Sequence, residues 1–261
     1  FSVCSSDLSN HAEFFRGGAW ASYRPVPGTE CCTGNVNRFM PNYVARQYFT
    51  DRGGNVYSAL FGESVYDHGG VRIEQKTDYP FDLRILWRIH TEREFVLFVR
   101  IPAWSQTYEV MRNGQAVKGE PKSGFMPVSV SEGDEVSLVL TAEPVRHESK
   151  GGVWFSRGPL VYSLGIPTKK IARRSEKRPG SDFPDYDIYP AGEWAYGVER
   201  GSRARFVDGV SREWRLADGL PHLTVRGRKL KNWDYERCDS VVRTVDLLKE
   251  DTPKEKISGK F

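Results

Sequence analysis

The sequence predicts a mainly β protein, an antiparallel β-sandwich preceded by one helix. From Val56 onward, apolar and polar residues alternate in short runs, which is the period of half-buried strands. Turn sequences separate these runs, and no helical pattern interrupts them. Only one stretch, before residue 50, has the spacing of a helix. A series of strands of this kind is typical of an antiparallel sandwich or barrel.

The predicted helix runs to about Phe49. Its apolar residues recur at three- and four-residue steps, namely Val36, Phe39, Met40, Tyr43, Val44 and Tyr48. Pro41 cannot donate to the helical ladder, so the helix either begins close before this residue or kinks there. The sequence TDRGGN at 50–55 is expected to end it.

The clearest strand pattern covers residues 81–89. Five apolar residues alternate there with polar ones and are expected to face the core: Phe81, Leu83, Ile85, Trp87 and Ile89. The sequences RNGQ at 112–115, KSG at 122–124 and EGD at 132–134 predict tight turns. Similar strands are predicted at 56–61, 71–76, 94–101, 107–111, 126–130, 135–140, 153–156 and 159–164.

These patterns divide the chain into four segments. Residues 1–50 contain the helix, and residues 51–166 form the predicted sandwich. Residues 167–192 are predicted to be a long loop, because they hold the basic run KKIARRSEKR and several prolines. Residues 193–261 should add further strands, at 193–198, 204–207, 213–216 and 223–226. The sequence VCSSDL at 3–8 is what a common sequencing adapter gives when translated, so we hypothesise that residues before about Ser9 are an assembly artefact.

Charge and hydropathy exclude two classes of partner. The 38 basic and 34 acidic residues are scattered along the chain, without the basic stripe that binds nucleic-acid phosphates. The longest apolar runs, such as Phe95 to Val99, are far too short to span a bilayer. We therefore expect neither a nucleic-acid nor a membrane partner.

The cysteine pair is the most unusual feature of the chain. Cys31 and Cys32 are adjacent in TECCTGNVNRF at 29–39, while the chain has only 4 cysteines in all. Cys4 and Cys238 are too far away in the sequence to suggest a disulfide framework. A strained vicinal disulfide and two small buried side chains are both compatible with the pair. The third interpretation is that the thiols carry chemistry.

The sequence ECCTGNVNRFMPNYV at 30–44 resembles the cysteine motif of family-127 glycoside hydrolases, the retaining β-L-arabinofuranosidases and their relatives. In that family the motif opens a late helix of an (α/α)6 barrel, and this chain supplies Cys31, Cys32, Asn35 and Arg38 in the same pattern. The sequences LFVRIPAW at 97–104, EGDEVSLVL at 132–140 and RGPLVYSL at 157–164 look like the sandwich that follows the barrel. The resemblance implies that residues 1–50 are the last piece of a truncated catalytic barrel.

The resemblance also implies a chemistry for the pair. Cys31 would be the nucleophile that forms a glycosyl-thioether intermediate. Cys31 and Cys32 would bind zinc with a Glu and a Cys from earlier in the barrel. A free thiol is mostly protonated at neutral pH, and both zinc and a helix amino end would favour the thiolate. The substrate would be an oligosaccharide or glycan with a terminal L-arabinofuranose.

The other candidates have simpler interpretations. Glu30 is expected to be a surface carboxylate or a neighbour of the site, and Cys238 an inert thiol. For His11 and Arg24, a structural histidine and a surface arginine are favoured over residues that line the sugar pocket. Three tryptophans are expected in the core rather than on a sugar-stacking surface, namely Trp87, Trp104 and Trp154.

Two functions therefore remain open. The first is a fragment of a glycoside hydrolase, inactive as this chain alone, because the acid/base residue and two zinc ligands would lie before Phe1. The alternative is a non-catalytic carbohydrate-binding or scaffold sandwich in which the cysteine pair is structural.

Overall fold

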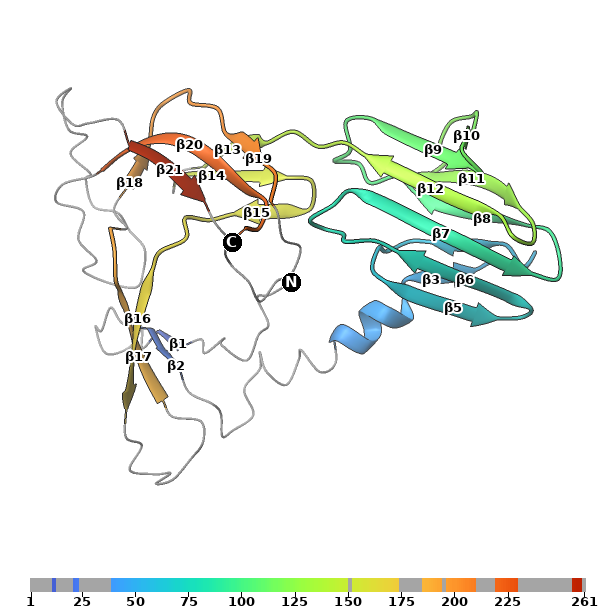
Figure 1. Cartoon of the computed structure of the whole chain (residues 1–261), viewed down its shortest axis with the longest axis horizontal. Coiled ribbons are helices and arrows are strands. Elements are labelled where there is room, and N and C mark those ends of the chain that lie inside the picture. Colours follow the sequence, from blue (N-terminus) through green and yellow to red (C-terminus); the bar gives the residue numbers. More distant parts are fainter. Residues whose placement is uncertain are drawn as a thin grey trace. The chain divides into compact units, whose positions relative to one another are not determined.

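A computed structural model of the chain describes residues 11–12, 21–23, 39–149, 152–173, 185–193, 196–209, 219–229 and 255–259. The described residues are mostly strands with one short helix, so the predicted mainly β fold is confirmed (Figure 1). One compact unit consists of residues 39–144 and 156–161, here called the sandwich unit. The other described residues belong to a second unit. No described helix is long and apolar enough to cross a membrane.

The larger sheet of the sandwich unit has six strands in the order β10-β9-β12-β7-β6-β5 (Figure 1). All its neighbouring strands are antiparallel. The strands predicted at 71–76 and 135–140 have these same bounds in the structure. The six strands are β5 (Ser64–His68), β6 (Val71–Lys76), β7 (Arg84–Thr91), β9 (Tyr108–Arg112), β10 (Gln115–Ala116) and β12 (Glu135–Leu140).

The smaller sheet has four strands in the order β11-β8-β4-β3. Its strands are β3 (Tyr48–Thr50), β4 (Val56–Ser58), β8 (Phe95–Arg100) and β11 (Phe125–Val130). The pair β4–β8 is parallel, whereas the other pairs are antiparallel. The parallel pair arises because the chain passes through β5, β6 and β7 of the larger sheet before it returns to the smaller one.

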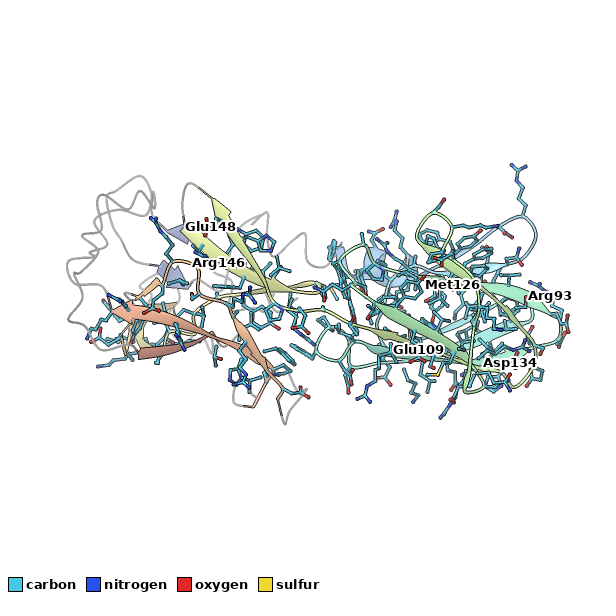
Figure 2. The ribbon with its side chains drawn as sticks, turned by 90° about the horizontal axis from the view of Figure 1, so that it is seen from above. Arg93, Glu109, Met126, Asp134, Arg146 and Glu148 are labelled. Atoms are coloured by element: carbon cyan, nitrogen blue, oxygen red, sulfur yellow. The ribbon has the colours of Figure 1, made fainter. Side chains whose placement is uncertain are left out.

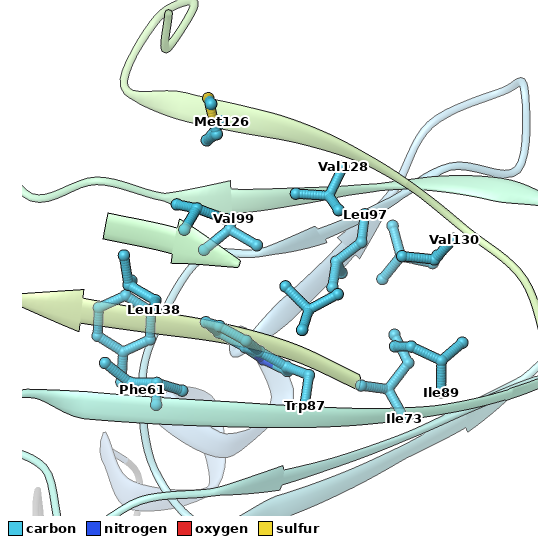
Figure 3. Packing of buried hydrophobic residues seen from close by; sticks show 14 of the residues in the cluster. Phe61, Ile73, Trp87, Ile89, Leu97, Val99, Met126, Val128, Val130 and Leu138 are labelled. Atoms are coloured by element: carbon cyan, nitrogen blue, oxygen red, sulfur yellow. The ribbon is translucent and has the colours of Figure 1, made fainter. Parts of the chain in front are cut away.

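The core lies between the inward faces of these two sheets (Figure 3). On β7, Ile85, Trp87 and Ile89 are at most 2% exposed and alternate with exposed or half-buried residues, as predicted. Leu83 is also buried, but Phe81 precedes the strand in a turn and is only half-buried, so its predicted position in the core is wrong. The opposite sheet contributes Leu97, Val99, Met126, Val128 and Val130.

The helix covers residues 39–45 in the described part of the chain. It ends at Ala45 rather than near Phe49, because the chain turns there and continues as β3. The turn is closed by backbone hydrogen bonds from Arg46 N to Tyr43 O (3.1 Å) and from Gln47 N to Val44 O (3.2 Å).

The second unit corrects the predicted long loop over 167–192. Residues Thr168–Arg173 and Asp185–Pro190 form the antiparallel strands β16 and β17, in a sheet with β1 (His11–Ala12) and β2 (Ala21–Tyr23). Strands β13 (Val145–Ser149), β14 (Gly152–Arg157) and β15 (Leu160–Tyr162) form a three-stranded sheet. A last sheet contains β18 (Tyr196–Val198), β19 (Arg205–Val207), β20 (His222–Lys229) and β21 (Glu255–Gly259). The strand predicted at 213–216 lies outside the described residues.

Candidate functional site

The predicted site lies outside the described residues. Cys31 and Cys32 fall in a part of the chain that the structure does not describe, as do Cys4, Glu30, Arg24 and Cys238. His11 is on β1, but the structure does not describe its side chain. The described chain resumes at Phe39, so the nearest described element to the cysteine motif is the helix 39–45. The contacts between this helix and the sandwich are therefore the described contacts nearest to the motif.

The helix is attached to the sandwich at two points. The phenol of Tyr43 donates a 2.8 Å hydrogen bond to the backbone carbonyl of Phe61. After the helix ends, the backbone carbonyl of Gln47 accepts hydrogen bonds from Ala59 N (2.8 Å) and Leu60 N (3.3 Å). Gln47 itself is only 4% exposed, although its side chain is polar. Both attachments therefore reach the same segment, 59–61, which follows β4.

Two aromatic rings pack against the side chain of Phe61, whose carbonyl accepts the Tyr43 bond. The Phe61 ring packs edge-on against Tyr79 (5.2 Å between centroids) and Trp87 (6.2 Å). Burial raises the pKa of Tyr43. Burial and, to a smaller extent, the nearby Tyr43 phenol raise the pKa of Tyr79 to about 12, against a small lowering by Arg100. Both phenols are therefore protonated at neutral pH, and they act as hydrogen-bonding and packing groups rather than as general bases.

Three apolar side chains of the helix are exposed. Phe39 is 46% exposed, Met40 42% and Val44 59%. Core residues are normally buried, so Phe39 and Met40 are much more exposed than the residues of a packed apolar face. Tyr43 is half-buried through its contact with the sandwich.

A buried polar network lies next to the segment 59–61, to which the helix is attached. Trp87 Nε1 donates to Ser58 Oγ (3.1 Å), which donates to Gln75 Oε1 (3.3 Å). Gln75 Nε2 in turn donates to the carbonyl of Gly62 (2.6 Å). All these groups are neutral and bonded to one another, so the network stabilises the core and has no evident acid or base function. It also confirms that Trp87 is a core residue.

A shallow hollow opens at the ends of β5, β6 and β7. Its volume is about 260 Å³, and its lining includes His90, Glu132, Asp67 and Glu92. His90 Nδ1 lies 3.6 Å from Glu132 Oε1, and the side chains of Glu132 and Asp67 are more than 60% exposed. Within the part of the chain that the structure describes, no three His, Cys, Asp or Glu residues are grouped so that they could hold a metal ion. The hollow is therefore a solvated surface.

The other two tryptophans differ in their environment. Trp104 is half-buried and packs against the sandwich core. Trp154, on β14, is 42% exposed and stacks on the His147 ring with centroids 3.7 Å apart. The prediction that Trp154 is a core residue is wrong, because on this strand Phe155 is the buried neighbour.

The sequence did not predict the hydrogen bond by which Tyr43 attaches the helix to the sandwich. The Tyr43 phenol was assigned only to an apolar helical face, and its acceptor is a backbone carbonyl 18 residues away. Such a bond leaves no residue-type signal in the sequence. The one available signal is the tyrosine itself, because a tyrosine on a half-buried face commonly finds a partner for its hydroxyl.

Comparisons with known proteins identify similar chains. Residues 55–142 match the model described as "Beta-L-arabinofuranosidase, GH127 middle domain". A GH127 β-L-arabinofuranosidase from Geobacillus stearothermophilus T6 is structurally similar, with a TM-score of 0.59 and 21% identity over 89% of this chain and 34% of that one. A protein described as a glycoside hydrolase has a TM-score of 0.60 and 20% identity over 98% of this chain and 40% of its own.

A further solved structure, a GH127 β-arabinofuranosidase, has a TM-score of 0.58 and 20% identity over 92% of this chain and 36% of that one. No curated protein matches the chain. At these identities the solved structures establish similarity of fold. The chain spans less than half the length of each of the three.

Proposed function

We propose that the chain is part of a retaining enzyme that releases terminal L-arabinofuranose from plant-type glycans, because residues 55–142 match the model of the GH127 middle domain. The observation that carries the proposal is the order of two independent features along the chain. The cysteine motif at 30–44 directly precedes the middle domain, as it does in the family that the motif resembles.

Cys31 is the proposed nucleophile. Its thiolate would attack the anomeric carbon of the sugar, while a general acid from another part of the protein gives a proton to the leaving oxygen. The new carbon–sulfur bond would then be broken by water, whose proton returns to the same acid/base group. The sugar is released with its original anomeric configuration, and the thiolate is regenerated.

Zinc is the proposed cofactor, and the donor chemistry of this chain fits it in part. Two adjacent thiols, Cys31 and Cys32, are typical zinc ligands, but a closed site needs four. Among the described residues, no three His, Cys, Asp or Glu side chains are grouped so that they could hold a metal ion, and in this proposal the remaining ligands come from elsewhere in the protein. When bound, zinc would keep the thiols ionised at neutral pH. The chain alone should therefore be inactive and bind the metal weakly.

The decisive experiment uses the full-length protein that contains this chain. An electrophilic arabinofuranose analogue should label Cys31 and leave Cys32 free, as peptide mass spectrometry would detect. Cys31→Ser should lower kcat by at least about a thousandfold, because an alcohol is scarcely ionised at neutral pH. Cys32→Ser should also lower activity, but together with zinc content measured by metal analysis.

Two results would contradict this proposal. The label could fall on a carboxylate, or Cys31→Ser could keep near-normal kcat with its zinc intact. Either outcome would show that the thiolate mechanism is wrong for this protein and that the cysteine pair is structural.

A further inference from the structure

We propose that Trp154 is the stacking residue of a glycan-binding surface on β14. Its ligand would be a neutral sugar ring of the arabinose-containing glycan on which the proposed enzyme acts, bound through the apolar C–H groups of that ring. The inference rests on the proposed function for the identity of the sugar. The binding itself requires no cysteine chemistry, so it can be tested without activity.

Trp154 lies on the exposed side of its strand. It is 42% exposed, whereas its neighbour Phe155 is only 7% exposed. Successive residues of a strand point to opposite faces, so the two side chains lie on opposite sides of β14. Trp87, by comparison, is fully buried in the core of the sandwich. The indole of Trp154 therefore leaves a broad apolar ring in contact with water.

The ring of Trp154 is held by a stacked partner. The His147 ring on β13 lies nearly parallel to the indole, at an interplanar angle of 9° with centroids 3.7 Å apart. A lone exposed apolar side chain is common on protein surfaces, and ordering it costs free energy when a ligand binds. The contact with His147 orders the indole before a ligand arrives. This orientation distinguishes Trp154 from a scattered exposed residue.

The surroundings of Trp154 favour an uncharged ligand. Val145 is 43% exposed and precedes His147 by two residues on β13, so both lie on the same face. Arg146 and Glu148 alternate with them and pair with each other at 2.7 Å, on the opposite face of the strand (Figure 2). Among the described residues of β13 and β14, His147 is therefore the one ionisable group on the Trp154 face. A strongly charged ligand would gain little there.

A sugar ring has the chemistry that this surface requires. One face of the ring presents C–H groups with a partial positive charge, and the face of an aromatic ring is negative. The hydroxyls lie around the rim of the sugar, where they stay hydrated. Contact with a single indole gives weak binding, with a Kd on the order of 1 mM. A polymer is retained more strongly, because its many equivalent rings raise the effective concentration of ligand.

The first test is native electrophoresis of this chain in gels that contain soluble arabinoxylan, a glycan with L-arabinofuranose branches. The wild-type chain should be retarded relative to a gel without glycan. Trp154→Ala should weaken the apparent affinity at least about fivefold, because the stacking ring is lost. Trp154→Tyr keeps an aromatic face and should retain most of the binding. His147→Ala should weaken binding about twofold, because the indole is no longer ordered in advance.

The matched control is Phe49→Ala. Phe49 is also an exposed aromatic residue, at 49%, but it lies on β3 of the sandwich unit. This variant should be retarded as strongly as the wild-type chain. Dextran in place of arabinoxylan should not retard any of the proteins.

A second measurement does not depend on the folding of a variant. N-bromosuccinimide oxidises accessible indoles, and peptide mass spectrometry gives the extent of oxidation at Trp154. Saturating arabinoxylan should slow this oxidation about threefold in the wild-type chain, because a bound sugar covers the exposed face of the indole. The same mass of dextran should not slow it.

The outcomes separate this inference from the proposed function. A wild-type chain that is not retarded, an equally retarded Trp154→Ala, or unchanged oxidation of Trp154 would each overturn the inference. Loss of binding in Phe49→Ala would also overturn it, because binding would then be general apolar adhesion. Binding through Trp154 to dextran alone would overturn the assigned sugar class. A full-length protein that binds arabinoxylan through Trp154 but has no glycosidase activity would overturn the proposed function and support the inference.

Discussion

The side chain of Asp134 stabilises the turn between β11 and β12 through several hydrogen bonds. Its carboxylate accepts hydrogen bonds from Ser131 N (2.7 Å) and Asn113 Nδ2 (2.7 Å), and it pairs with Arg112 Nη2 at 2.7 Å. The residue is 5% exposed, in the turn between β11 and β12 (Figure 2). Burial alone would raise the pKa of Asp134, but these hydrogen bonds together lower it below the ordinary 3.8. The carboxylate is therefore stabilised in its ionised form.

Asp134→Asn should reduce the free energy of unfolding by about 2 kcal/mol at pH 7, because Arg112 loses its charged partner and one oxygen acceptor is replaced by a donor. The folded-state pKa is lowered, so this contribution is complete above the ordinary pKa and is lost as the pH falls through the folded value. The wild-type and variant curves, measured by urea unfolding, should therefore converge as the pH falls below the ordinary pKa of 3.8 and through the lower folded-state value. A constant difference down to pH 2 would show that the charge of Asp134 is not the cause.

At the scale of elements, the turn between β9 and β10 illustrates a reliable sequence signal. The sequence RNGQ predicted a tight turn, and Asn113 (φ 51°) and Gly114 (φ 75°) both adopt the left-handed conformation that such a turn requires. Asn113 also bonds to Glu135 through its amide and its side chain, so the turn is joined to β12.

Gly114→Ala should lower the free energy of unfolding by about 1 kcal/mol. A Cβ at this position would meet nothing within 4 Å, so backbone strain is the only cost. Chemical denaturation would measure the effect, and Ala116→Ser on the exposed strand β10 serves as the control, with a change below about 0.5 kcal/mol. A neutral Gly114→Ala would mean that the turn relaxes into another conformation.

Elements with one buried face could be predicted, whereas those without one could not. Strand β6 alternates buried and exposed residues, and its bounds match the prediction. The missed strands β16 and β17 pair with each other through backbone hydrogen bonds, but they place Lys170 opposite Ile188 and Ile171 opposite Asp187. Polar and apolar residues are thus mixed along the hairpin, so the periodicity that identifies a strand is weak.

The end of the helix was misjudged for a related reason. Tyr48 continues the helical spacing of Phe39, Met40, Tyr43 and Val44, but it also fits the start of a strand. Pairing of β3 with β4 decides between the two, and such long-range pairing is not visible in local spacing. The same limitation applies to the candidate site. The motif identified Cys31 and Cys32, whereas the Tyr43 bond depends on which carbonyl the folded chain brings to it.

At the scale of the whole sandwich unit, the outer faces of the two sheets differ in chemistry. Ion pairs cross the outer face of the larger sheet, where Arg72 bonds to Asp67 (3.2 Å) and Arg88 to Glu135 (3.5 Å). On the smaller sheet, Tyr57 stacks on Phe98 with centroids 4.3 Å apart. Exposed ion pairs contribute little to stability because water screens them. The stability of the unit should therefore come mainly from the core between the sheets.

This conclusion predicts a sharp contrast between buried and exposed apolar residues. Leu138→Ala should lower the free energy of unfolding by about 3 kcal/mol, because Leu138 is fully buried in β12 and its loss leaves a cavity between the sheets. Val65→Ala should change it by less than about 0.5 kcal/mol, because Val65 is 55% exposed on the edge strand β5. Arg88→Ala, which removes the exposed pair with Glu135, should cost less than about 1 kcal/mol.

Urea unfolding followed by tryptophan fluorescence would measure all three variants, since Trp87 lies in the same core cluster and reports its disruption. If burial dominates, Arg88→Ala must lower the free energy of unfolding by less than Leu138→Ala does. A cost of Arg88→Ala equal to that of Leu138→Ala would instead place a large share of the stability on the charged face, and the core between the two sheets would not be the main source of the fold's free energy.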